Sequence, residues 1–186
     1  PEDHEGTDRI NCMNYAGQGF PMCYDGHDGS DFMLLGGFDT MDRGSARIVA
    51  AAGGVVVRAE DGNYDRCHSS VATMDVDCDG NEMRANVVVL EHWFGWRTVY
   101  AHFKRGSVRV AEGDVVECGQ FLGLVGSSGY SSGPHLHFEV QMSEGDSIDP
   151  FAGPHSQEHS YWVEQDAGDG LPGDVFDPAW VSAPPQ

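Results

Sequence analysis

Short runs of β-branched and aromatic residues, separated by turn residues, are the sequence feature that most limits how this chain can fold. Val, Ile, Phe and Tyr recur in runs between turn signals such as Gly53-Gly54 and Asp61-Gly62-Asn63. Pleated strands favour such side chains, and Gly and Asn favour tight turns, so this pattern predicts strands. Extended helical periodicity is missing, and we therefore expect an all-β fold made mainly of antiparallel sheet. The expected strands are Ala46–Ala50, Val55–Ala59, Val87–His92, Arg97–His102, Gly123–Val125 and His135–Gln141.

The length of 186 residues suits one compact domain with its own core. From about Gly153 the composition shifts to Pro, Gly, Asp, Ser and Gln, which is typical of an irregular tail. We expect an N-terminal segment over 1–25, one domain over 26–152 and an irregular C-terminal tail over 153–186. No apolar run reaches the length of about 18 residues that a membrane-spanning helix needs, so no membrane span is expected.

The charge balance bears on possible partners. Lys and Arg number 10 and Asp and Glu number 30, which gives a net charge of −20. A chain with this charge repels polyanions and offers no basic patch for a phosphate backbone. We expect a monomer with no nucleic-acid partner.

The five cysteines include two close pairs, Cys12 with Cys23 and Cys67 with Cys78. None has the CxxC spacing of a metal or redox site, so two local disulfides are expected. Disulfides persist in oxidising compartments, which favours the periplasm or the outside of the cell. This pairing leaves Cys118 alone.

The histidines in His135-Leu136-His137 lie in an expected strand. Side chains alternate along a strand, so both imidazoles project from one face, about 7 Å apart. They can share a site without sharing a role. We expect one to bind a metal and the other to handle protons.

A second cluster runs from Gly26 to Phe32 and contains His27 and Asp31. Its glycines disfavour a helix, so a loop is expected to bring both side chains to one metal. Imidazole nitrogen and carboxylate oxygen are good zinc ligands. Together with one histidine of the strand they leave a fourth position open, as catalytic zinc requires.

A third candidate is His102, in Tyr100-Ala101-His102 at the end of an expected strand. Alternation predicts that Tyr100 and His102 share a face. An imidazole titrates near neutral pH, so His102 is a candidate for acid–base work.

The order His-x-x-x-Asp, Tyr-x-His and Gly-x-His-x-His-Phe-Glu-Val resembles the lysostaphin-like, or LytM-type, peptidases, which are also called the M23 family. The resemblance runs from roughly Gly26 to Phe151. Further stretches that resemble the family are 47–56, 110–116, 119–126, 127–134 and 148–151.

The resemblance implies Zn²⁺ ligands at His27, Asp31 and His137, and a catalytic pair at His102 and His135. In such a site the zinc polarises the scissile carbonyl and lowers the pKa of its water, while the histidine pair moves the proton and stabilises the oxyanion. The family also implies an antiparallel sheet with a groove over one face, bounded by long loops, and with the zinc on its floor.

The implied activity is that of a secreted or periplasmic bacterial zinc endopeptidase that cuts stem or cross-bridge peptides of peptidoglycan. Two alternatives stay open: a secreted protease for proteins in general or for Gly-rich proteins, and a non-catalytic scaffold that binds or activates a wall hydrolase. The sequence departs from the family over 61–86, a long segment that carries the Cys67/Cys78 pair.

Two weaker patterns have competing interpretations. Asp75, Asp77 and Asp79 resemble the start of a calcium loop, although Asn86 replaces the carboxylate expected at the twelfth position, and a solvated acidic loop is the alternative. The stretch His155 to His159 matches an HxxEH pattern, but it follows Gly153-Pro154 without an apolar helical stripe. We interpret that match as chance.

Overall fold

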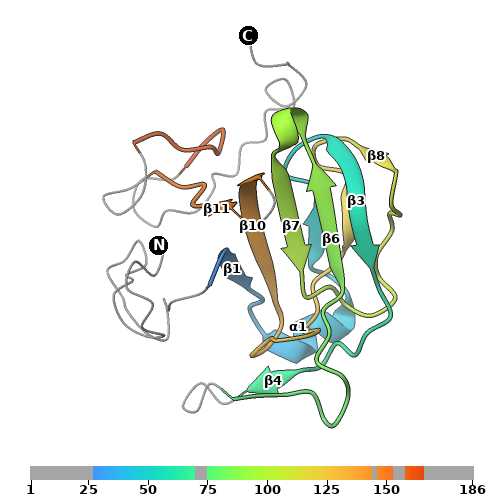
Figure 1. The fold of residues 1–186 in the computed structure, drawn as a ribbon. Helices are drawn as coiled ribbons and strands as arrows, with labels where there is room; N and C mark the ends of the chain where they lie inside the picture. Colours follow the sequence, from blue (N-terminus) through green and yellow to red (C-terminus); the bar gives the residue numbers. More distant parts are fainter. Residues whose placement is uncertain (1–26, 70–74, 144–145, 153–157, 166–186) are drawn as a thin grey trace. The chain divides into compact units, whose positions relative to one another are not determined.

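The computed structural model describes residues 27–69, 75–143, 146–152 and 158–165 (Figure 1). The chain divides into two compact units, Ser30–Asp146 and a unit made of Pro1–Gly29 with Ser147–Gln186. Each unit is described by itself.

Antiparallel strands make up most of the first unit. They are β1 (Ser30–Met33), β2 (Arg47–Val49), β3 (Gly54–Glu60), β4 (His68–Ser69), β5 (Val76–Asp77), β6 (Val87–Glu91), β7 (Arg97–Ala101), β8 (Val115–Val116), β9 (Phe121–Leu124) and β10 (His135–Ser143). The helix α1 (Gly37–Arg43) and a 3₁₀ turn, η1 (Trp93–Gly95), interrupt them, and β11 (Asp146–Ile148) follows. The expected all-β, mainly antiparallel fold class is confirmed.

The main sheet has the strand order β1-β10-β7-β6-β3-β8. Its neighbouring strands are antiparallel, with β10 between β1 and β7 (Figure 1). In β6, Val87 to Leu90 are all buried, which explains why this strand reads as a continuous apolar run rather than an alternating one. The central strands thus form a rigid base for the side chains of β1 and β10.

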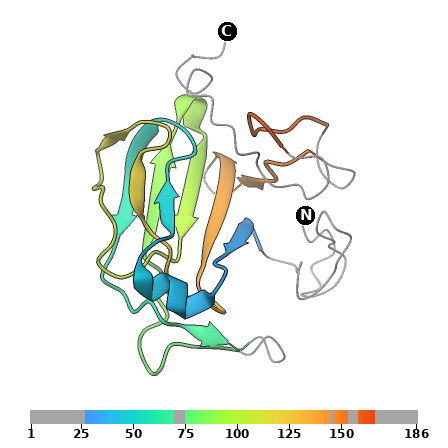
Figure 2. The same cartoon turned by 180° about the vertical axis from the view of Figure 1, so that it is seen from behind.

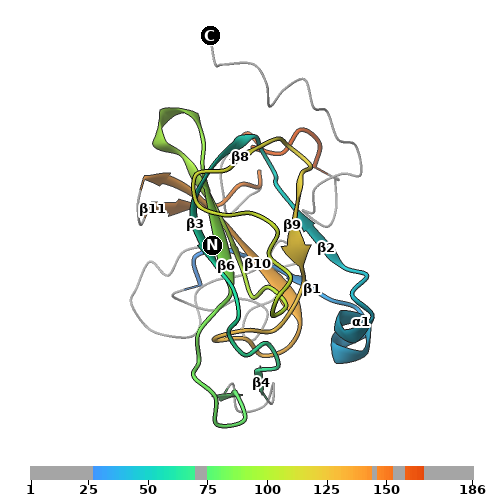
Figure 3. The ribbon, with the colours of Figure 1, turned by 90° about the vertical axis from the view of Figure 1, so that its right-hand side faces the viewer.

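A second, two-stranded sheet of β2 and β9 lies against one face of the main sheet (Figures 2 and 3). Ile48 and Leu122 from these strands are buried. The close approach of Phe103 requires a glycine in β9, because a Cβ on Gly123 would lie 2.6 Å from the Phe103 ring. The hydroxyl of Tyr100 in β7 accepts a hydrogen bond from the Ala51 amide, just after β2, at 2.8 Å. Tyr100 therefore faces the small sheet.

All six expected strands are present, with bounds shifted by a few residues. One expectation is wrong: Asp31 lies in β1, an edge strand paired with β10, and not in a loop. This strand has only four residues, and its pairing depends on a partner about 100 positions away, which local pattern does not show. The helix α1 was not predicted from the sequence. Only Met41 of its seven residues is buried, so the helix has no apolar stripe.

The long 61–86 segment carries the Cys67–Cys78 disulfide, as expected, and the small β4–β5 hairpin. Cys118 is a free thiol. The expected Cys12/Cys23 pair lies outside the described residues. Within the part of the chain that the structure describes, no helix is long and apolar enough to cross a membrane.

In the second unit, Phe151 is buried and its ring packs against that of Trp162, with centroids 5.5 Å apart. The side-chain amide of Gln165 forms two hydrogen bonds with the Ala152 backbone, accepting from the amide at 2.9 Å and donating to the carbonyl at 2.8 Å. Most of the tail expected over 153–186 lies outside the described residues.

Candidate metal centre and histidine cluster

The antiparallel register of β1 and β10 places Asp31 directly opposite His137. Side chains opposite one another on antiparallel strands share a face. The Asp31 Oδ1 atom lies 3.0 Å from His137 Nδ1 and 3.5 Å from His135 Nε2. One carboxylate oxygen thus meets both imidazoles of the HxH strand, and the expectation that they share a face is confirmed.

His27 completes a group of three possible metal ligands. One ligand atom each from His27, Asp31 and His137 lie within 4.8 Å of one another, and this is the only such group of three or more among the described His, Cys, Asp and Glu residues. Two imidazoles and one carboxylate match the nitrogen and oxygen donors that zinc prefers. Three protein ligands also leave a coordination position for a substrate or water, unlike a closed structural site.

Glu139 supports His137 from the other side. Its Oε1 lies 2.9 Å from His137 Nε2, and its Oε2 accepts a hydrogen bond from the Gln141 amide at 2.8 Å. Burial alone lowers the pKa of His137, but the bonds to Asp31 and Glu139 outweigh it and raise that pKa to about 9. Carboxylates in this position commonly orient a metal-binding imidazole. Sequence reasoning missed Glu139, although its place two residues after His137 put it on the same face.

His102 joins the cluster from the end of β7. Its ring centroid lies 4.5 Å from that of His135 and 5.8 Å from that of His137. The Nδ1–H donates to the Ser128 carbonyl at 2.7 Å, so Nε2 is the nitrogen that carries the lone pair in the neutral ring. Burial, and then the neighbouring His135, lower the pKa of His102 to about 3, so the ring is neutral at pH 7.

The expectation that Tyr100 and His102 share a face is wrong. Tyr100 packs against the Phe138 ring at 5.3 Å and bonds to the Ala51 amide, on the face of the small sheet. His102 has a φ of 67°, a left-handed conformation that breaks the alternation and turns its ring to the opposite face. Such a backbone costs about 1 kcal/mol or more in a non-glycine residue, and here it brings an imidazole beside the Asp31 and His137 pair.

His135 has an arrangement similar to that of His102. Its Nδ1 lies 2.7 Å from the Gly133 carbonyl and 3.3 Å from the Ser131 hydroxyl, which fixes Nδ1 as the protonated nitrogen. Its Nε2 faces Asp31. Both histidines are buried, and both are held by backbone carbonyls with Nε2 toward the cluster. An imidazole that donates from Nδ1 in this way can accept a proton at Nε2 when it is neutral.

The calcium expectation at Asp75, Asp77 and Asp79 receives no support. Asp77 Oδ1 accepts the Asp79 amide at 2.8 Å, and Asp79 Oδ2 accepts from the Tyr64 hydroxyl. These three residues do not bring ligand atoms together into a group within the part of the chain that the structure describes. The acidic stretch runs through β5 into a turn at Asp79, and these hydrogen bonds engage the carboxylates of Asp77 and Asp79.

Comparison with known proteins identifies the family. The profile of Peptidase family M23 matches residues 27–150, two thirds of the chain. The chain belongs to peptidase family M23. Members of this family are zinc metallopeptidases, which agrees with the donor set of His27, Asp31 and His137.

Several curated proteins are similar to parts of this M23 chain. It is 43% identical to the DD-carboxypeptidase/endopeptidase Mpg of Neisseria meningitidis over 65 residues, which are 35% of this chain and 14% of that protein. It is 42% identical to the peptidoglycan DD-endopeptidase ShyB of Vibrio cholerae over 55 residues, 30% of this chain and 12% of that protein. Lysostaphin of Staphylococcus staphylolyticus is 49% identical over 47 residues, 25% and 9% of the two chains. The M23 chain thus aligns with only a small part of each relative.

Among solved structures, the catalytic domain of lysostaphin from Staphylococcus simulans has a TM-score of 0.44 at 27% identity, covering 78% of this chain and 86% of that one. The prophage-encoded M23 protein EnpA from Enterococcus faecalis has a TM-score of 0.46 at 23% identity, covering 84% and 92%.

Proposed function

We propose that this chain is a zinc endopeptidase that hydrolyses peptide bonds in bacterial peptidoglycan. The observation that carries the proposal is the convergence of His27, Asp31 and His137 within 4.8 Å, beside two buried histidines that are held in one tautomer. An ion at three such ligands has room for a further ligand, which distinguishes a catalytic site from a structural one.

The protein residues divide into two groups in this proposal. His27, Asp31 and His137 would hold the zinc, with Glu139 orienting His137. The zinc would supply Lewis-acid polarisation of the scissile carbonyl and a water of lowered pKa. His102 and His135 would then accept and return a proton at Nε2, and donate from Nε2 to the developing oxyanion once protonated.

The names of the relatives support the substrate class. Mpg is named as a carboxypeptidase and endopeptidase, and ShyB as a peptidoglycan endopeptidase. We infer from them that stem or cross-bridge peptides are the substrates here. The Cys67–Cys78 disulfide is consistent with a secreted or periplasmic protein of the cell envelope, where such bonds persist.

The decisive experiment is digestion of purified sacculi by the zinc-loaded chain. Mass spectrometry of the released fragments identifies the bond, and a Gly-rich protein serves as the parallel substrate. We expect sacculi to be solubilised and the Gly-rich protein to stay intact. Cleavage of the protein alone would favour the general protease, and binding to sacculi without any fragment would favour the non-catalytic scaffold.

Matched histidine variants assign the activity to the site. His137→Ala should abolish digestion, whereas His159→Ala, at an exposed position of the second unit, should digest at the native rate. The second variant also tests the HxxEH stretch, because loss of activity in His159→Ala would indicate that this stretch takes part in the reaction.

A further inference from the structure

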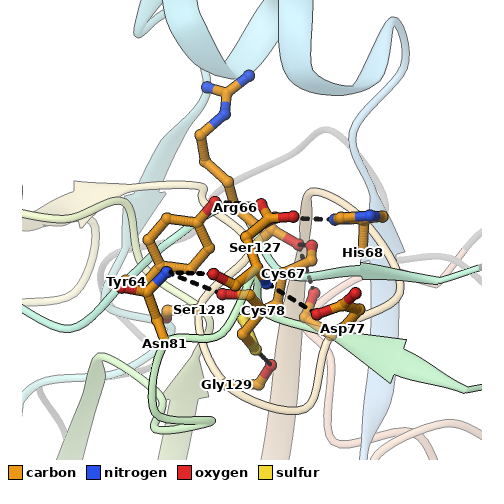
Figure 4. The surroundings of a disulfide bond; sticks show 12 residues. Tyr64, Arg66, Cys67, His68, Asp77, Cys78, Asn81, Ser127, Ser128 and Gly129 are labelled. Carbon is orange, nitrogen blue, oxygen red and sulfur yellow. Dashed lines mark hydrogen bonds between the residues drawn. A yellow bond between two sulfur atoms is a disulfide. The ribbon is translucent and has the colours of Figure 1, made fainter.

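The Cys67–Cys78 disulfide lies against Ser127 and Gly129 (Figure 4). We name residues 127–133 the serine loop, and the described residues 63–69 and 75–86 the disulfide loop. We propose that the disulfide loop is a positioning brace: it fixes the serine loop, and the serine loop fixes the Nδ1–H tautomer and the ring orientation of His102 and His135. The assignment of proton transfer to these histidines rests on the proposed function.

The first contact joins Cys67 to Ser127 in both directions. The Cys67 amide donates to the Ser127 carbonyl at 2.9 Å, and the Ser127 hydroxyl donates to the Cys67 carbonyl at 2.6 Å (Figure 4). Both residues are completely buried. Breaking these bonds would be costly, because no water reaches the buried groups to replace the lost partners. The position of Cys67 therefore constrains that of Ser127.

The second contact involves Cys78 and the far end of the disulfide loop. The Cys78 sulfur lies 3.7 Å from the Gly129 carbonyl oxygen, a packing contact because a disulfide sulfur carries no hydrogen. Gly129 also lies against Ala85 so closely that a Cβ on this glycine would be 2.7 Å from the Ala85 amide. The Asn86 amide donates to the Ser128 hydroxyl at 2.9 Å. The disulfide loop thus contacts Ser127, Ser128 and Gly129 in turn.

The serine loop carries these contacts to the histidines. The Ser128 carbonyl accepts from His102 Nδ1 at 2.7 Å, and the Ser128 hydroxyl donates to the Phe103 carbonyl next to it at 3.1 Å. The hydroxyls of Ser127 and Ser131 lie 2.8 Å apart, and that of Ser131 lies 3.3 Å from His135 Nδ1. All three serines are buried. His102 thus bonds directly to Ser128, which contacts the disulfide loop. His135 Nδ1 lies 2.7 Å from the Gly133 carbonyl and is linked to Ser127 through the Ser131 hydroxyl.

A local disulfide suits this role because it narrows the conformations open to the loop it closes. Cys67 and Cys78 are 11 positions apart, and the described residues between them, 68–69 and 75–77, are exposed or half-buried. Without the bond, Cys67 and Cys78 are no longer held together, although Asn63 stays hydrogen-bonded to Ala85 and Asn86. The serine loop then loses a fixed neighbour on the Cys67 and Cys78 side. The metal ligands on β1 and β10 do not depend on these contacts, because β-sheet pairing positions Asp31 and His137.

The test compares Cys67→Ser/Cys78→Ser with Cys118→Ser, which removes the free thiol and leaves the brace intact. Three properties are measured on zinc-loaded full chains: the imidazole tautomers by long-range ¹H–¹⁵N NMR, the zinc affinity by competition with a chelator, and kcat and KM on sacculus-derived peptides. We expect the double variant to show mixed tautomers at His102 and His135 and roughly a tenfold or greater fall in kcat, since small misplacements of catalytic groups are costly. Its KM and zinc affinity should stay within about twofold, and Cys118→Ser should match the native chain in every measurement.

A second variant tests the proposal even if the double cysteine variant does not fold. Ser127→Ala keeps the disulfide and removes the hydroxyl that links Cys67 to Ser131, and it should shift the His135 tautomer with the zinc affinity unchanged. Native tautomers and native kcat in both variants would overturn the proposal. Failure of the proposed function has a different signature: the native chain itself would release no fragments, while the tautomer measurement would still decide the role of the brace.

Discussion

Asp31 and His137 face one another across β1 and β10, with 3.0 Å between the carboxylate Oδ1 and the imidazole Nδ1. The pairing of two strands fixes this relationship, and their register is specified wherever one face is buried. A slip of β1 by one residue would turn Asp31 to the opposite face and remove the carboxylate from the cluster. The register of this four-residue edge strand therefore determines whether Asp31 lies beside His137.

Substitution of two different histidines should distinguish loss of zinc binding from loss of turnover. His137→Ala should lose both, because it removes one of the three proposed zinc ligands. His102→Ala should keep zinc and lose about 100-fold or more in kcat, the range typical of a general acid–base group. Metal analysis of the dialysed variants, together with a peptide cleavage assay, checks both. A His102→Ala variant that cuts at the native rate would remove the proton role from His102.

Glu139→Gln should weaken zinc binding by about 10- to 100-fold, because it replaces the carboxylate that holds His137 Nε2 at 2.9 Å. Chelator competition measures this without any substrate. Glu112→Gln, at an exposed position far along the sequence from the cluster, is the matched control and should bind zinc normally. Equal zinc affinities for the two variants would show that Glu139 plays no part in orienting the imidazole.

Metal removal should lower the thermal stability of the native chain. A ligand that binds only the folded state stabilises it by about 2.7 kcal/mol at 100 times its Kd. Melting curves with added zinc and with a chelator should therefore differ for the native chain and coincide for His137→Ala. If both chains gave the same zinc-dependent rise in Tm, the stabilising ion would lie outside the proposed centre.

The central strands were predictable because apolar runs and alternation are local patterns. The five site residues, His27, Asp31, His102, His135 and His137, were named from local motifs together with the resemblance to the M23 family. The backbone of His102 could not be predicted in this way. Its positive φ occurs together with hydrogen bonds to Gly126 and Ser128, which lie more than 20 residues away in the sequence. Such long-range contacts leave no local pattern. The pairing of β1 with β10 also needs long-range register, so Asp31 was placed in a loop.

The same limit explains why the role of the disulfide loop was not visible in the sequence. The spacing of Cys67 and Cys78 predicted a local bond, and the structure confirms it. The contact of Cys67 with Ser127 joins segments 60 positions apart, and neither residue belongs to a recognisable motif for such a contact. Close approach at Gly129 leaves one trace in the sequence, a glycine, but glycines are too common here to single it out.

His92 gives the fold a pH dependence that is separate from the metal centre. Its Nδ1 lies 2.8 Å from the Gly53 carbonyl and its Nε2 2.8 Å from the Thr98 hydroxyl, so the neutral ring donates at one nitrogen and accepts at the other. Burial lowers the pKa of His92 below its usual 6.5, against a smaller opposing effect of the Gly53 bond. Protonation would charge a largely buried ring and remove the acceptor that Thr98 uses.

The sign of the effect follows from this lowered pKa. The unfolded chain binds the proton more readily than the folded chain, so the stabilisation from His92 is complete above about pH 6.5 and is lost as the pH falls toward the folded-state pKa. His92→Gln does not titrate, and the Tm difference between the native chain and this variant should shrink steadily from pH 7.5 to pH 5. Taking the difference at each pH cancels the titration of the metal ligands and of His102, which the two chains share. A Tm difference that stays constant or grows on acidification would mean that His92 accepts its proton freely in the folded state.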